Sequence, residues 1–148
     1  MPIVVCLALL VVGCGAKPSS HAPKSRAVAV LPDVPFETLD HDQRIQFMKD
    51  TVVPAMQPIF QRHDAKEYAE FGCKTCHGEG AAVGNFEMPN VNLPALDFAD
   101  LSKHEPADLE WMSKQVKPAM AKLLREPEYS KEAPDGFGCA HCHPVATK

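Results

Sequence analysis

The chain has 148 residues and a formal net charge of −4, with 15 Lys and Arg against 19 Asp and Glu. This length suits one domain. The mildly acidic balance gives no indication of a nucleic-acid surface, which would need concentrated positive charge, so we expect no nucleic-acid partner.

The beginning of the chain contains signals for export. Residues 3–12 are an uncharged apolar run, too short for a permanent membrane span and typical of a secretory signal peptide. The run ends in Val11-Val12-Gly13-Cys14, which resembles the bacterial lipobox, where a small residue precedes a cysteine that becomes lipidated. We therefore expect a lipoprotein-type signal peptide at 1–13 and a lipid on Cys14.

A flexible tether is expected to follow at 14–36, because residues 15–36 are rich in Pro, Ser and Ala and lack apolar periodicity. An ordinary signal peptide cleaved near Gly15-Ala16 is the alternative, and it would leave a soluble periplasmic protein. The lipobox favours the lipid-anchored form, on the periplasmic side of the bacterial cell envelope.

Two amphipathic helices are predicted in the remainder of the chain. Asp40 and Gln43 match a capping box at the start of the first helix, and Pro106 lies near the start of the second. Pro54 and Pro118 should kink the two helices. In both helices apolar residues recur at spacings of three and four, on one face: Ile45, Met48, Val52, Met56 and Ile59, then Leu109, Met112, Val116, Met120 and Leu123.

Each helical pattern is followed by the pentapeptide Cys-x-x-Cys-His, the attachment signature of c-type haem. Two thiols three positions apart can form thioethers with the two vinyl groups on one edge of a porphyrin. The histidine that follows then lies beneath the ring, where its imidazole can bind the iron. The motifs predict two covalently bound haem c groups, with thioethers at Cys73, Cys76, Cys139 and Cys142 and iron ligands at His77 and His143.

Two other cysteine sites fit the spacing less well. Zinc ribbons separate their Cys-x-x-Cys pairs by about 12 to 20 residues, whereas 62 residues lie between Cys76 and Cys139. Zinc also gives no reason for a histidine directly after both pairs. A thioredoxin-like dithiol needs a βαβ context that the sequence lacks.

The motifs end two copies of a longer unit. Phe47-Met48 and Trp111-Met112 are 64 residues apart, and Phe71-Gly72-Cys73 is repeated 66 residues later. The segment 78–99 is predicted to be a connector without regular structure. We expect a mainly α fold, a multihaem cytochrome c with two pseudo-repeated helix–connection–Cys-x-x-Cys-His units and long loops. The domain would span 37–148, with unit one at 37–100 and unit two at 101–148.

The second axial ligand of each iron must come from elsewhere in the chain. Only five residues follow His143, and none is Met or His, so the second iron needs a ligand from upstream or from the other unit. Four methionines obey the repeat and form two candidate pairs, Met48 with Met112 and Met56 with Met120. His63, His104 and His41 do not obey it, and we expect them to be solvated surface side chains. We expect the same of His141, which is trapped between two haem cysteines.

Residues 38–77 and 101–143 resemble the haem units of the tetrahaem cytochrome subunit of photosynthetic reaction centres, in which a helix carrying the axial methionine precedes Cys-x-x-Cys-His. The stretches that lead to Phe47-Met48 and Trp111-Met112 are similar to the stretch before the family's ligand methionine. The resemblance therefore favours Met48 and Met112 as distal ligands. The spacing to the haem cysteines is closer to the family's for Met56 and Met120, which stay the alternative.

The sequence favours an electron carrier over an enzyme. His/Met ligation fills both axial positions and raises the reduction potential relative to bis-His ligation. We expect a membrane-tethered dihaem cytochrome c that passes single electrons between redox protein partners. The alternatives are a small dihaem oxidoreductase and a haem sensor with one open iron site.

Overall fold

The structure, a computed structural model, describes residues 34–146. The predicted signal peptide at 1–13, the lipidation site Cys14 and most of the predicted tether at 14–36 lie outside the described residues. In the described part, no helix is long and apolar enough to cross a membrane.

The first helical rod runs from His41 to His63. It consists of α1 (His41–Phe47), a π-helical turn (Met48–Val52) and α2 (Val53–His63). The predicted capping box is confirmed: the Gln43 N–H donates to Asp40 Oδ1 at 2.9 Å, and the Asp40 N–H donates to Gln43 Oε1 at 3.0 Å. These bonds satisfy two backbone groups that a helix start would otherwise leave without partners.

The second rod repeats this order. It consists of α4 (Pro106–Trp111), a π-helical turn (Met112–Val116) and α5 (Lys117–Leu124). Pro106 opens α4, where its missing N–H would have had no helical partner. The rod ends where Arg125 takes a left-handed conformation with φ of 61°. Both π turns lie at positions 64 residues apart, as the repeat does.

The prolines explain the π turns. A proline inside an α-helix lacks the N–H, and its ring clashes with the carbonyl four residues before it. Here the helix widens instead, with the N–H of Val53 bonded to the carbonyl of Met48, five residues back, directly before Pro54. Lys117 and Met112 do the same before Pro118. The predicted distortions therefore take the form of a single π turn, the rare local widening that also disturbs other helices.

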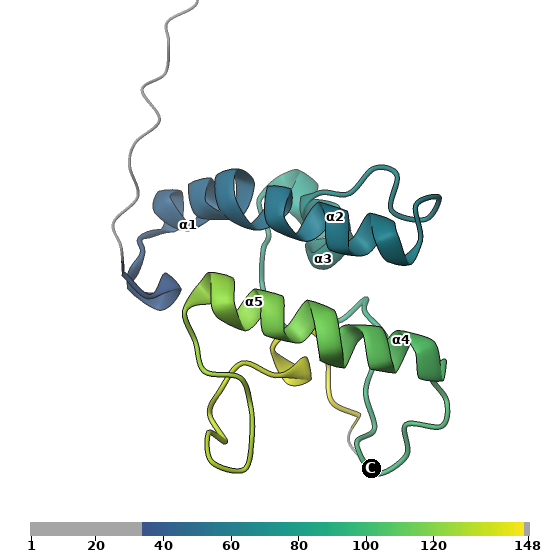
Figure 1. Cartoon of the computed structure of the whole chain (residues 1–148). Helices are drawn as coiled ribbons and strands as arrows, with labels where there is room; N and C mark the ends of the chain where they lie inside the picture. The colour runs from purple at the N-terminus through teal and green to yellow at the C-terminus, as the bar shows by residue number, and fades with distance from the viewer. Residues whose placement is uncertain (1–33, 147–148) are drawn as a thin grey trace, which may run out of the picture. The chain divides into compact units, whose positions relative to one another are not determined.

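The two rods lie side by side and antiparallel (Figure 1), with α2 against the π turn of the second rod and α5 against that of the first. Their contact is built on Val52, Met56, Phe60 and Trp111, all of them buried. The rings of Phe60 and Trp111 meet edge to face at 4.9 Å. The predicted apolar faces contribute Val52 and Met56 to this core, while Phe60 and Trp111 lie outside the predicted pattern.

The remaining elements are short. α3 (Cys73–His77) carries the first motif, a 3₁₀ segment follows at Gly78–Val83, and another covers Cys139–His141 in the second motif. Residues 34–146 contain no β-strand, only two isolated bridges. The mainly α class is confirmed, but the prediction of an irregular connector over 78–99 is wrong for its first six residues. Gly78, at φ of 65°, turns the chain out of α3 directly into the 3₁₀ segment.

Candidate functional site

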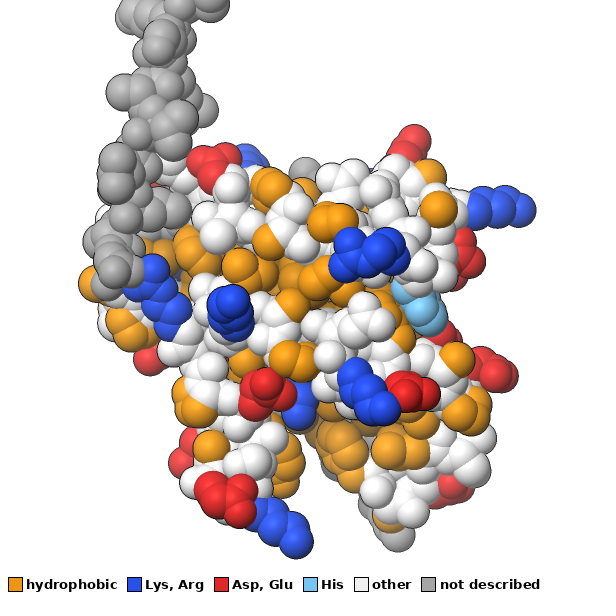
Figure 2. Space-filling view, viewed as in Figure 1, with side chains coloured by type: hydrophobic (Ala, Val, Ile, Leu, Met, Phe, Trp, Pro, Cys, Tyr) orange, Lys and Arg blue, Asp and Glu red, His pale blue; other side chains and the backbone are white. Residues whose placement is uncertain are grey.

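One cavity of about 1030 Å³ is lined by both rods and by the loops that carry the two motifs. This volume is at the upper limit for small-molecule sites, about 300–1,000 Å³. Hydrophobic side chains are visible in the hollow between the two lower lobes of Figure 2. Every candidate site residue in the described part lines the cavity: Met48, Met56, Cys73, Cys76, His77, Met112, Met120, Cys139, Cys142 and His143.

Each motif forms a helical turn that is held by a capping hydrogen bond, which we did not predict from the sequence. In the first, the Gly72 N–H donates to Thr75 Oγ1 at 3.1 Å. In the second, the Gly138 N–H donates to His141 Nδ1 at 3.0 Å. Thr75 and His141 occupy the same position of the pentapeptide. A polar residue three positions after the start of a turn is the available sequence signal.

The two motif histidines differ in their surroundings. His143 Nδ1 lies 3.0 Å from the carbonyl oxygen of Pro94. A carbonyl can only accept, so Nδ1 carries the proton, and Nε2 of the neutral ring keeps a free lone pair. Nδ1 of His77 is buried and has no hydrogen bond of good geometry in the described structure, although the backbone of Phe86 lies near enough to act on the ring. Burial lowers the pKa of His77, and the backbone of Phe86 opposes this only in part. The lowered pKa favours the neutral imidazole, which is the form that metals bind.

The second thiol of each motif is in an environment that suppresses its ionisation. Burial raises the pKa of Cys76 to about 11, with a smaller contribution from Cys73. Burial likewise raises the pKa of Cys142 to about 12, helped by Cys76 and Cys139. All four cysteines in residues 34–146 are free.

A metal site formed directly by side chains was one of the alternatives. Across the described residues, no group of three His, Cys, Asp or Glu side chains is close enough to hold a metal ion.

The four repeated methionines are not equivalent. Met56 is only 2% exposed, because it is packed inside the core between the rods. Met48, Met112 and Met120 are half-buried, and all three line the cavity. Met48 and Met112 are each the first residue of a π turn. In this respect the pair Met48 and Met112 is symmetric, whereas Met56 and Met120 differ in burial.

The histidines outside the repeat are placed in different surroundings. His63 is exposed at the surface, as predicted, but its side chain also makes two contacts there. Its ring stacks on Trp111 at 3.9 Å, and its Nε2 lies 2.8 Å from Asp108 Oδ1. His41 and His104 line the cavity, as does Met88, which has no counterpart in the second unit.

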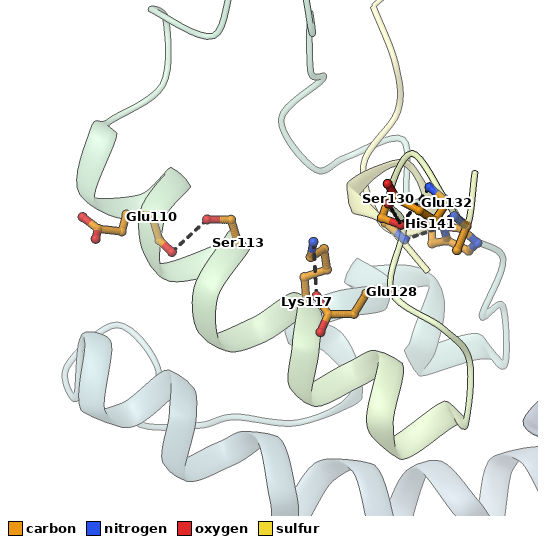
Figure 3. Close-up of polar contacts among 9 residues, drawn as sticks. Glu110, Ser113, Lys117, Glu128, Ser130, Glu132 and His141 are labelled. Carbon is orange, nitrogen blue, oxygen red and sulfur yellow. Dashed lines mark hydrogen bonds and ion pairs between the residues drawn. The ribbon is translucent and has the colours of Figure 1, made fainter. Parts of the chain in front are cut away.

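The loop before the second motif is tied to the second rod. Lys117 extends from α5 toward Glu128 in that loop, with Nζ 3.3 Å from Oε2 (Figure 3). Gly136 allows the loop to close, because a Cβ there would lie 2.6 Å from the carbonyl oxygen of Pro127. The Phe137 N–H donates to that same oxygen at 2.8 Å. These contacts hold Cys139 and Cys142 beside the cavity.

The segment 90–96 contacts both motifs, and no sequence pattern predicted this. Asn90 hydrogen-bonds to the first and second motif, Pro94 accepts from His143, and the Leu96 N–H donates to the carbonyl of Pro144 at 2.8 Å. The connector therefore helps to bring the two motifs to one cavity.

Comparison of the chain with protein-family models, with curated proteins and with solved structures finds no match.

Proposed function

We propose that this protein is a dihaem c-type cytochrome that carries single electrons between redox protein partners. In this proposal a lipid on Cys14 tethers it to a membrane on the periplasmic side of the bacterial cell envelope. The observation that supports the proposal best is the single cavity lined by both Cys-x-x-Cys-His motifs and by the four repeated methionines.

The chemistry of the residues that line the cavity suits two covalently bound haem groups. Each motif presents two free thiols and an imidazole at the cavity. At His143 the hydrogen bond to Pro94 leaves Nε2 available as a donor to iron. The half-buried thioethers of Met48 and Met112 would offer soft sulfur ligands to the two irons. The proposal is therefore two covalent haems with His/Met ligation.

The roles of the protein side chains follow from this arrangement. The cysteines would fix the position of each haem through two bonds, and His77 and His143 would set the orientation of each iron. The haem supplies an iron that takes up and releases one electron. The methionine ligands favour the reduced state and so raise the potential. If a histidine and a methionine held each iron, no position on the metal would stay open for a substrate, as a carrier requires.

Mass spectrometry of the mature protein tests the proposal. The protein purified from an exporting bacterial host should carry two covalent haems and a lipid-modified Cys14. Cys14→Ser should release it into the soluble periplasm with both haems attached. A protein without covalent haem would refute the proposed function. A Cys14→Ser variant that stays in the membrane fraction would refute only the lipid anchor.

The two sites should differ in reduction potential. A hydrogen bond from Nδ1 makes an imidazole a stronger donor to its metal, and a stronger donor stabilises oxidised iron. His143 has this bond to Pro94 at 3.0 Å, whereas Nδ1 of His77 has no hydrogen bond of good geometry in the described structure. The site of His143 should therefore have the lower potential.

Two matched variants separate these potentials. Cys139→Ala/Cys142→Ala retains only the site of His77, and Cys73→Ala/Cys76→Ala retains only that of His143. Redox titration followed by visible absorption should give the lower midpoint for the second variant. The reverse order would show that the hydrogen bond of His143 does not set the difference.

A further inference from the structure

Asn90 connects the two motifs through hydrogen bonds. Its side-chain Nδ2 donates to the carbonyl oxygen of Cys76 at 2.9 Å, and its backbone N–H donates to that of Cys142 at 3.0 Å. Cys76 and Cys142 are the second cysteines of their motifs, and each directly precedes a candidate iron-binding histidine. One residue of the connector therefore holds equivalent points of the two units.

Asn90 is itself fixed in place. Its Oδ1 accepts from the Asn92 N–H, and its backbone carbonyl accepts from the Leu93 N–H, both at 3.0 Å. Asn90 is only 6% exposed and is the buried polar residue of the described part of the chain. A buried polar group that loses its hydrogen-bond partner is destabilising, so the amide resists rotating out of these bonds.

The first motif leaves room for this amide. Residue 78 follows His77, and a Cβ there would lie 3.2 Å from Asn90 Nδ2. Gly78 has no Cβ, and its φ of 65° is in the left-handed region that glycine tolerates best. The exit from the first motif is thus shaped so that Asn90 can approach its backbone.

We propose that Asn90 is a positioning residue that sets the separation and relative tilt of the two motifs, and through them the electronic coupling between the two attached haems. The inference rests on the proposed function. Asn90 does not line the large cavity; it lines a smaller hollow of about 110 Å³ that also borders His77. It therefore acts through the backbones of Cys76 and Cys142 and not by touching the haems.

Circular dichroism in the Soret region tests this role. Two haems held close together at a fixed angle give a band of two opposite lobes, because their transition dipoles couple and this coupling falls steeply with distance. Asn90→Leu keeps the branched shape of the side chain, its number of heavy atoms and the backbone N–H, but removes both side-chain hydrogen bonds. Asn92→Leu is the matched control, because Asn92 is exposed and takes part in the turn through its backbone N–H.

The two-lobed band should be present in the unaltered protein and in Asn92→Leu, and it should be lost in Asn90→Leu. Asn90→Leu should still carry two covalent haems by mass spectrometry and keep its Met–iron absorption. Three results would overturn the inference: a two-lobed band that persists in Asn90→Leu, an equal loss in Asn92→Leu, or failure of Asn90→Leu to attach both haems, which would mark a purely structural role. Absence of the band from an unaltered protein with two haems would overturn it as well. Absence of haem from the unaltered protein would instead refute the proposed function.

Discussion

Expressed without the haem-attachment machinery, the chain should lack a cooperative thermal transition. The reason is the cavity, which the two rods and the motif loops surround without filling. Several apolar side chains that line it are only half-buried by protein atoms: Met48, Phe71, Phe86, Met112 and Met120. These groups need an apolar partner, which the proposed haems would supply.

The effect should be large because the cavity is large for a chain of this size, at about 1030 Å³. A whole domain is stabilised by only about 5–15 kcal/mol, so apolar contacts missing along the cavity wall weigh heavily. Water filling an apolar space gains too few hydrogen bonds to replace the missing contacts. The apoprotein should therefore collapse or unfold.

The measurement is calorimetry, or circular dichroism at 222 nm with rising temperature, on the chain made with and without haem attachment. The haem-loaded protein is the control, and it should unfold in one sharp transition. A sharp transition in the haem-free chain would show that the rods form a core of their own and do not depend on the cofactor.

The local parts of the fold could be predicted from the sequence because they depend on neighbours along the chain. The capping box of Asp40 and Gln43 needs only two residues three positions apart, and it formed as predicted. Pro106 at the start of α4 is a similar case. The two prolines identified where the helices are disturbed. The form of the disturbance could not be predicted, since a proline can be accommodated by a bend or by a π turn.

Contacts between segments distant in the chain were missed. No sequence pattern indicated that the exposed ring of His63 stacks on Trp111, 48 positions later. Asn90 and Pro94 lie in the connector, which has no counterpart in the second unit, so the repeat could not single them out. The candidate site itself was predictable in its chemistry, because Cys-x-x-Cys-His is local. That both motifs line one cavity depends on how the connector packs, and no sequence pattern carries that information.

The choice between the two methionine pairs gives the other large effect. Met48→Leu or Met112→Leu should remove the soft ligand from one iron and lower its potential. The same iron should then bind carbon monoxide. The packing cost should be small, below about 1.5 kcal/mol, because Leu and Met have similar volumes. The near-infrared band of the Met–iron bond should lose one haem's share in each single variant, and it should vanish in the double variant.

Met56→Leu and Met120→Leu are the matched controls, because they make the same change on the same two rods. Met56 is 2% exposed, and protein atoms already surround it. To bind iron it would have to leave a core that includes Phe60 and Trp111, at the cost of a void there. Met48 and Met112 could bind iron without leaving a core, because both are half-buried and lie at equivalent points of the two π turns. We therefore expect the band to persist in both controls.

If the controls lose the band while Met48→Leu and Met112→Leu retain it, the ligand pair is wrong and the dihaem proposal stands. If all four variants retain it, an asymmetric ligand such as Met88, which lines the cavity without a repeat partner, must bind one of the irons.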